Sequence, residues 1–115
     1  MTHKNTSYQQ DLIQSLQDPR EAAAYLNAAI EDGDKNVFLL ALRNVAEAHG
    51  GMGKIAEKSH LNRENLYRML SQKGNPEIKS LYALLQAMGL KLSVEPHEQH
   101  TEKKWVGLND WTTAE

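Results

Sequence analysis

Residues 52–71 read Met-Gly-Lys-Ile-Ala-Glu-Lys-Ser-His-Leu-Asn-Arg-Glu-Asn-Leu-Tyr-Arg-Met-Leu-Ser. Apolar residues recur at helical spacing on both sides of a break at Ser59 and His60, and Asn62 is a residue type that caps helices. This spacing predicts two short helices that meet at a three-residue turn, which is a helix-turn-helix arrangement. Ala56 supplies the small residue that two closely crossing helices need. The apolar residues expected to hold the pair to the body are Ile55, Leu61, Leu66 and Met69.

Two positions depart from the usual helix-turn-helix pattern. Glycine normally stands at the place of His60, where the backbone is left-handed, and a large apolar residue normally stands at the place of Ser59. Histidine tolerates the left-handed conformation at a strain of roughly 1 kcal/mol. We therefore expect a left-handed backbone at His60. The alternative is a plain helical hairpin with no role in nucleic-acid binding.

Outside this stretch, caps and apolar spacing predict further helices. Asp18 followed by Pro19 is a helix start, and Gly33 followed by Asp34 ends that helix and begins the next. The apolar residues of the helix that follows Asp34 cover much of its circumference, which predicts that it is the centre of the core. The expected helices cover about residues 8–16, 18–32, 34–49, 55–59, 62–72 and 81–89.

Residues 90–95, Leu-Lys-Leu-Ser-Val-Glu, alternate apolar and polar side chains with the period of a strand. A lone strand leaves its backbone groups unpaired, so we expect a partner for it. That partner is either a second copy across a two-fold axis or residues 105–108 of the same chain. The predicted organisation is an N-terminal segment with a short helix (1–17), a domain (18–95) and a polar tail (96–115).

The composition of the 115 residues is typical of a single small domain. No apolar run approaches the ~18 residues that span a bilayer, so we expect no membrane protein. The absence of cysteine excludes disulfides, thiolate metal sites and cysteine nucleophiles, and with the polar start it favours the bacterial cytoplasm. No histidine, serine or carboxylate spacing assembles a catalytic or metal site, so we expect neither an enzyme nor a cofactor.

The net charge of -2 is unevenly distributed along the chain. Residues 50–80 carry six Lys/Arg against three Asp/Glu, a net charge of +3. Residues 1–49 carry four against seven, and residues 81–115 carry three against five. A local basic patch attracts phosphate even on an acidic chain, so the predicted helix pair is also the expected nucleic-acid-binding segment.

Seven short segments between Asp18 and Glu95 carry a family resemblance: Asp18-Pro19, 24–29, 40–46, Ile55-Ala56, 61–67, 74–76 and 84–92. Through them the chain resembles the probable addiction-module antidote family (HigA-like antitoxins), of the lambda-repressor-like helix-turn-helix class. It departs from that family at Gly53 and His60, where a small hydroxyl residue and a glycine are usual. The resemblance implies an all-α, five-helix DNA-binding domain with a short C-terminal strand and a polar tail.

The resemblance also implies a function and its residues. Such an antitoxin is encoded beside a small RelE-like toxin that cleaves messenger RNA, binds that toxin, and represses their shared operon. The positions that match base-contacting residues are Asn62, Arg63, Glu64, Tyr67 and Arg68, and the candidates for phosphate contacts are Lys54, Lys58, Lys73 and Asn75. Arg63 and Arg68 are the best base readers because a guanidinium bonds two guanine acceptors at once. Asn62 either contacts a base or uses its side chain to cap the helix.

The implied partners are double-stranded operator DNA, a second copy of the chain in a homodimer, and a small toxin. Two alternatives stay open at this point: a stand-alone, phage-type helix-turn-helix regulator without a toxin, and a purely protein-binding adaptor. A short basic open reading frame beside the gene favours the antitoxin. The apolar residues of the tail are either anchors for the toxin or a segment that folds back on the body or closes the dimer; they are Trp105, Val106, Leu108 and Trp111.

Overall fold

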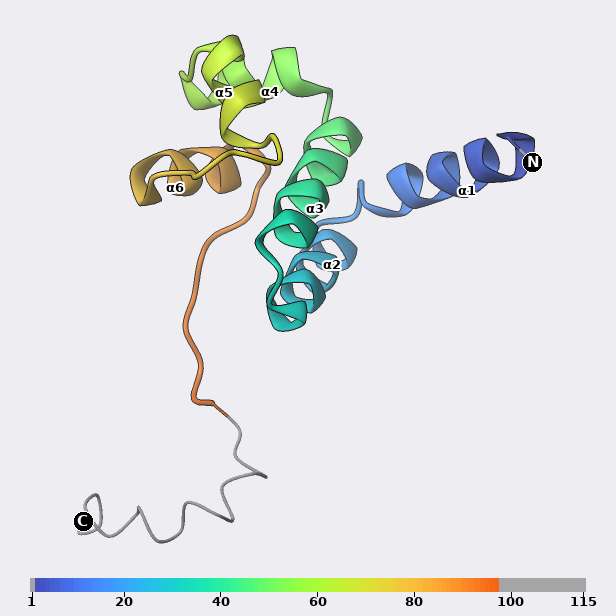
Figure 1. Cartoon of the computed structure of the whole chain (residues 1–115), viewed down its shortest axis with the longest axis horizontal. Helices are drawn as coiled ribbons and strands as arrows, with labels where there is room; N and C mark the ends of the chain where they lie inside the picture. Colours follow the sequence, from blue (N-terminus) through green and yellow to red (C-terminus); the bar gives the residue numbers. More distant parts are fainter. Residues whose placement is uncertain (1, 98–115) are drawn as a thin grey trace, which may run out of the picture.

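A computed structural model describes the backbone of residues 2–97 and the side chains of residues 7–97. Over this range the chain is helical, with six helices and no strand: α1 Thr2–Ser15, α2 Pro19–Asp32, α3 Lys35–Ala48, α4 Met52–Ser59, α5 Arg63–Met69 and α6 Ile78–Ala87 (Figure 1). Helices α2–α6 fall within residues 18–95. The described chain thus has one helix more than the five-helix fold that the resemblance implies. The additional helix, α1, was predicted over residues 8–16 but begins at Thr2, so Ser7 lies inside it and not at its start.

The ends of α2 and α3 are set by the residues that the sequence indicated. The side chain of Asp18 accepts a hydrogen bond from the Arg20 N–H at 2.9 Å, and that of Asp34 accepts one from the Asn36 N–H at 2.8 Å. Gly33 has φ 84° and ends α2 in the left-handed conformation. The predicted helix boundary at Gly33 and Asp34 is therefore confirmed.

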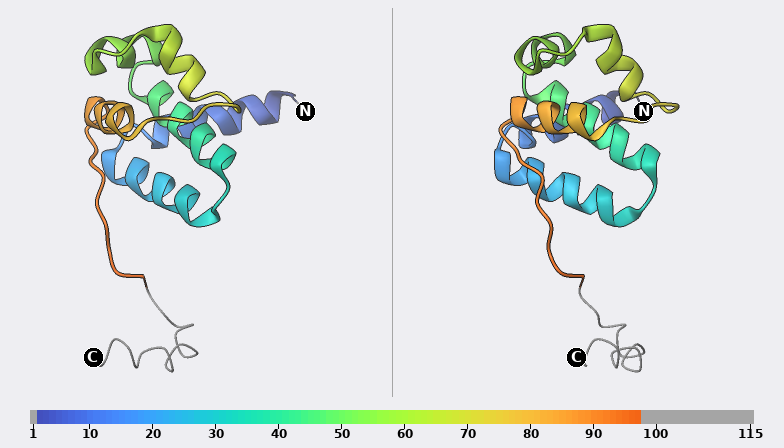
Figure 2. Two further views of the ribbon diagram at one scale, coloured as in Figure 1. Left: turned by 60° about the vertical axis from the view of Figure 1, so that its left-hand side comes forward. Right: turned by 90° about the vertical axis from the view of Figure 1, so that its left-hand side faces the viewer.

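Helix α3 is the centre of the core. Leu42, Val45 and Ala46 on this helix expose no surface. Helix α2 packs along α3, and the two lie side by side in both views of Figure 2. Helix α1 reaches α3 through its C-terminal half, and Leu16, just beyond the end of α1, is buried in the same core. Helix α4 contacts α3 and in turn packs against α5 and α6.

The apolar pattern of α3 predicted burial around much of its circumference, but part of this apolar surface is exposed. Val37 is 38% exposed and Leu40 is 50% exposed, although both fit the apolar pattern. Helices α2, α1 and α4 approach α3 from limited directions and leave this strip uncovered over the described residues. Helix α3 therefore contributes both to the core and to the surface.

The strand predicted over residues 90–95 is absent from the described part of the chain. Helix α6 ends at Gly89 and Leu90, whose N–H groups bond to the Gln86 and Leu85 carbonyls at 3.0 and 2.8 Å. Leu90 is partly buried against the core, but residues 91–97 are exposed and extended away from it. Alternation of apolar and polar residues is not enough to make a strand, because a strand also needs hydrogen bonds to a second backbone segment. Residues 91–96 have no such partner within the described range.

The two most distinctive parts of the chain lie at opposite ends of the molecule. Figures 1 and 2 show α4 and α5 together at one end, while the extended segment of residues 90–97 runs from α6 past α2 toward the other. The predicted tail continues this segment, and its residues 98–115 lie outside the described part of the chain.

Gly74 lies where the chain turns back after α5. Its N–H donates to the Ser71 carbonyl oxygen at 2.8 Å, and the residue is buried. A Cβ at this position would overlap the carbonyl oxygen of Met69 and lie 2.7 Å from that of Arg68. Both neighbours are backbone atoms, which cannot rotate away. The passage from α5 to α6 therefore requires glycine at this position.

We expect Gly74→Ala to destabilise the protein by about 2 to 3 kcal/mol, the usual cost of forcing an extra methyl group into a packed site. The matched control is Gly53→Ala in α4, where the added Cβ would meet only side-chain atoms of Arg63 at 3.6 Å or more. That change should be neutral or stabilising, because alanine favours a helix more than glycine does. Urea unfolding of the two variants measures both effects, and equal midpoints would contradict the close approach at Gly74.

Candidate nucleic-acid interface

Helices α4 and α5 are short and are held together by apolar residues. They comprise eight and seven residues, too few to be stable in isolation, so their order depends on packing. Ile55 and Leu66 expose no surface, and Ala56, at the predicted crossing of the two helices, is 4% exposed. Leu61 and Met69 are partly buried against the same core. The apolar residues that the sequence singled out therefore fix the pair to the body.

The turn between α4 and α5 has the predicted left-handed residue. His60 has φ 61° and ψ 30°, and it is the one non-glycine residue with positive φ among the described residues. Its N–H bonds to the Glu57 carbonyl at 3.3 Å, and the Leu61 N–H bonds to the Ala56 carbonyl at 3.0 Å. These two bonds form a Schellman motif, which satisfies the last carbonyls of α4.

Ser59 resolves the second departure from the usual pattern. It is 8% exposed at a position where a large apolar residue was expected. Its hydroxyl donates to the Ile55 carbonyl at 2.7 Å, so the polar group is satisfied by its own helix. A serine is accommodated here because its buried hydroxyl has a hydrogen-bond partner.

Asn62 caps α5. Its Oδ1 accepts hydrogen bonds from the N–H groups of Glu64 and Asn65 at 2.8 and 3.2 Å. The sequence left open that Asn62 caps the helix and does not contact a base. The two bonds show that its side-chain oxygen does act as the cap. Only the side-chain NH₂ of Asn62 is left to contact a base.

The other predicted base-contacting residues lie on α5 and are exposed. Arg63 and Tyr67 are four residues apart and therefore share a side of the helix, as do Glu64 and Arg68. The guanidinium carbon of Arg63 is 5.7 Å from the centre of the Tyr67 ring, which is within cation–π range. Tyr67 is 49% exposed. The structure thus brings these four side chains together on one short helix.

The predicted phosphate-contacting residues lie on two segments beside α5, and all are exposed. Lys54 and Lys58 are four residues apart on α4, while Lys73 and Asn75 lie on either side of Gly74 in the connection to α6. The stem of Lys54 covers Gly50, where a Cβ would come within 2.7 Å of the lysine Cδ. Within the described residues no carboxylate forms an ion pair with these lysines.

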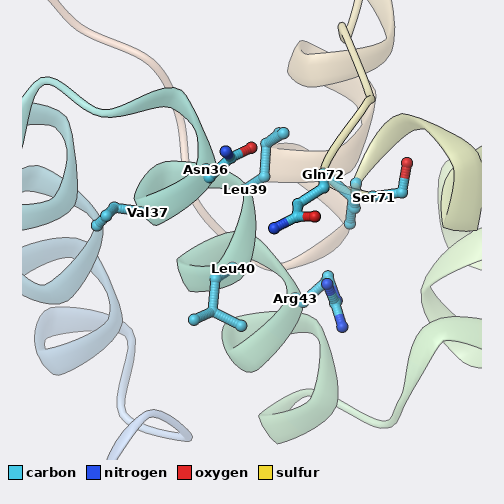
Figure 3. A pocket seen from close by; sticks show the side chains of 8 residues that line it. Asn36, Val37, Leu39, Leu40, Arg43, Ser71 and Gln72 are labelled. Atoms are coloured by element: carbon cyan, nitrogen blue, oxygen red, sulfur yellow. The ribbon is translucent and has the colours of Figure 1, made fainter.

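A shallow hollow of about 440 Å³ lies between α3 and the segment that follows α5. Figure 3 shows Leu40 and Arg43 of α3 on one wall, with Ser71 and Gln72 facing them. Arg43 therefore adds a cation beside Ser71 and Gln72 that sequence reasoning did not single out. Nothing in the local sequence indicated it, because Arg43 and Ser71 are 28 positions apart and only the folded chain brings them together.

Gly53 is the second neighbour that the sequence did not assign to the site. A Cβ at Gly53 would be 3.6 Å from the Arg63 Cζ and 3.7 Å from its Nη1. The guanidinium of Arg63 thus lies directly against the first turn of α4. No signal in the sequence indicated this contact, because the helix predicted over residues 55–59 begins after Gly53, whereas the observed α4 begins at Met52.

Comparison with known proteins identifies the family. The family model described as "Probable addiction module antidote protein" matches residues 6–96. The chain belongs to this antidote family. A relative from Haemophilus influenzae (strain Rd), described as an uncharacterized protein, is 31% identical over 85 residues, which cover 74% of this chain and 87% of the relative. No solved structure gives a significant match.

Membership indicates an antitoxin role for this antidote and implies a toxin partner. It also agrees with the expectation of a non-enzymatic protein, since antidotes generally act by binding. The matched range includes α4, α5 and all nine predicted contact residues. Over the described residues, no helix is long and apolar enough to cross a membrane.

We expect His60→Gly to stabilise the antidote by up to about 1 kcal/mol, because glycine adopts the left-handed backbone without strain. The greater freedom of glycine in the unfolded chain subtracts from this gain. His60→Ala is the matched control and should destabilise by about 1 kcal/mol, since alanine tolerates this conformation less well than histidine. Urea unfolding should give the highest free energy of unfolding for the glycine variant, then the parent protein with histidine, then the alanine variant. A clear loss of stability in the glycine variant would contradict this prediction and reveal a contact made by the histidine ring.

Proposed function

We propose that this chain is an antitoxin that binds operator DNA through α4 and α5, represses its own operon, and neutralises a RelE-like toxin. The observation that carries the DNA-binding part is the division of α5 into two sides. Leu66 is fully buried against the body, whereas Arg63, Glu64 and Asn65 in the first turn are exposed and polar. A helix anchored on one side and polar at its free N-terminal end is suited to reading the major groove.

The dimensions of this helix support the same role. An α-helix with its side chains is ~10–12 Å across, and the major groove of B-DNA is ~12 Å wide. Helix α5 stands at one end of the molecule with α4 beside it, so a duplex can approach without meeting α2 or the extended segment. In this proposal α5 enters the groove and α4 crosses the backbone.

The proposed roles follow from the chemistry of each side chain. Arg63 and Arg68 read guanine, since each guanidinium can donate to O6 and N7 together. Glu64 can accept from cytosine, and the amide of Asn62 donates with its nitrogen only. Tyr67 supports Arg63 and contacts a base edge or methyl group. Lys54, Lys58, Lys73 and Asn75 bind phosphates, which gives affinity and register without sequence information.

The groove assignment predicts two kinds of defect. Arg63→Ala and Arg68→Ala should each weaken binding to the preferred operator by about 1 to 3 kcal/mol and relax base preference at one position. Lys73→Ala should weaken binding to all sequences alike and lower the salt slope by about one. Fluorescence anisotropy titrations at several salt concentrations, on specific and scrambled duplexes, separate the two.

Lys35→Ala is the matched control for these titrations, because Lys35 is exposed at the start of α3, outside the α4–α5 pair. It should leave both the affinity and the salt slope unchanged. If both arginine variants bind the operator as tightly as the parent protein, the assignment of α5 to the groove is wrong.

The homodimer is proposed from the extended segment after α6. The backbone groups of residues 91–96 have no described hydrogen-bond partner, and Val94 is 96% exposed. A second copy across a two-fold axis would pair these segments and cover Leu92 and Val94. Because α4 and α5 lie at the other end of the molecule, such a dimer would hold two α5 helices apart, as half-sites about 34 Å apart require.

The toxin contact is proposed for the tail, whose apolar residues lie outside the described part of the chain. Trp105 and Trp111 are two of the seven aromatic residues of this protein and stand in an otherwise polar segment. Aromatic residues in polar segments are typical anchors for binding partners. The acidic helices α1 and α2 are the second candidate, since a basic toxin would be attracted to residues 1–49, with a net charge of -3.

Co-expression with the product of the adjacent gene tests the antitoxin role. We expect a small protein to co-purify, growth to be rescued from its toxicity, and light scattering to give a mass with two antitoxin copies. Truncation after Glu95 should lower toxin affinity at least tenfold if two aromatic anchors are lost. Unchanged affinity would move the contact to α1 and α2, and a single antitoxin copy with and without DNA would exclude the dimer.

A stand-alone DNA-binding regulator is the alternative function. It shares α4 and α5 with the antitoxin, so DNA titrations do not separate the two. The same co-expression does, because a regulator has no toxic neighbour to neutralise. An adaptor that binds only protein would lack salt-sensitive DNA binding altogether.

A further inference from the structure

The side chain of Arg63 is held between two helices. On one side, its guanidinium lies against Gly53 of α4, with Cζ, Nη1 and Nε at 3.6, 3.7 and 3.8 Å from where a Cβ would stand. On the other, its Cζ lies 5.7 Å from the centre of the Tyr67 ring. An exposed arginine normally samples many rotamers, so contacts on two sides restrict the directions in which it points.

Gly53 lowers the stability of its own helix. Glycine inside a helix is less favourable than alanine by roughly 0.5 to 1 kcal/mol, and Gly53 gains nothing from backbone freedom because its φ is not positive. It also makes no close approach to another backbone, unlike Gly74. The feature that distinguishes Gly53 is the guanidinium beside it, which a side chain larger than alanine would displace.

We propose that Gly53 and Tyr67 are positioning residues that orient Arg63 for one base pair of the operator, so that Gly53 determines sequence specificity without touching the bases. This inference rests on the proposed DNA-binding function and deepens it. A preorganised guanidinium loses less freedom when it forms its two hydrogen bonds to guanine. A displaced one would bind phosphate or water instead, and preference at that base pair would fall.

Paired substitutions separate positioning from packing. Gly53→Ala adds a methyl group at ordinary contact distance and should leave Arg63 in place, whereas Gly53→Leu fills the space that the guanidinium occupies. Tyr67→Phe retains the ring, and Tyr67→Leu removes it. We expect Gly53→Ala and Tyr67→Phe to keep the preference at the base pair that Arg63 reads, whatever the Tyr67 hydroxyl contributes elsewhere. The two leucine variants should lose that preference, as Arg63→Ala does.

The experiment is selection of bound duplexes from a randomised pool by each full-length variant, followed by titration of the selected sequence and its single-base variants at one salt concentration. Preference at one base pair should fall about tenfold in Gly53→Leu, Tyr67→Leu and Arg63→Ala. The other positions should be unchanged in Gly53→Leu and Arg63→Ala, whereas Tyr67→Leu should also alter the position that Tyr67 itself contacts. The double variant Gly53→Leu/Arg63→Ala should be no worse than Arg63→Ala, because both changes remove the same contact. Unchanged preference in Gly53→Leu would overturn the inference.

A second measurement does not depend on DNA. The Nε–H resonance of Arg63 in the free protein should be shifted by the ring current of Tyr67, and the shift should persist in Gly53→Ala and vanish in Gly53→Leu and Tyr67→Leu. A shift that survives in Gly53→Leu would also overturn the inference. The proposed function fails separately: if the parent protein enriches no sequence from the pool, DNA recognition is wrong whatever the resonance shows.

Discussion

Removal of Leu42, Val45 and Ala46 from water is the interaction on which the other helices depend. Helices α1, α2 and α4 pack directly against α3, but α5 packs mainly against α4. Helix α5, which is proposed to read DNA, is thus attached to α3 mainly through α4. Seven residues cannot form a stable helix in water, so α5 depends on packing. It packs through the buried Leu66 and against α4, which in turn packs against α3. Loss of the α3 core would therefore remove the proposed DNA-binding surface together with the fold.

The sequence predicted those features that neighbouring residues determine. Caps at Asp18, Asp34 and Asn62, the left-handed stop at Gly33 and the left-handed His60 all follow from two to four consecutive residues, and the structure has them. Features that need distant partners were missed. The strand over residues 90–95 needs a second chain segment, the exposure of Leu40 depends on which helices cover α3, and the contact between Gly53 and Arg63 needs the turn between them to be folded. For the predicted contact residues, the structure shows that they are exposed and which residues lie beside them. Their role in binding stays a prediction, which the titrations test.

The separation of α4 and α5 from the extended segment gives this small domain two independent surfaces. A protein that represses an operon and neutralises a toxin has to bind DNA and protein, and surfaces at opposite ends allow both at once. Assembly through the extended segment would also link the two functions, because two copies hold a two-fold operator more tightly than one. Changes in partner binding at one end could then alter DNA occupancy without any change in α5.

The turn at Gly74 constrains how such a protein can evolve. If α5 reads DNA as proposed, specificity for a new operator can be acquired through its exposed residues, and the proposed phosphate contacts can move among the lysines, since none of these side chains supports the core. Position 74 lacks this freedom, because any Cβ there meets the carbonyl groups of Met69 and Arg68 whatever DNA is bound. Related proteins are therefore free to differ at the exposed residues on either side of this glycine, such as Lys73 and Asn75, while the glycine itself stays fixed.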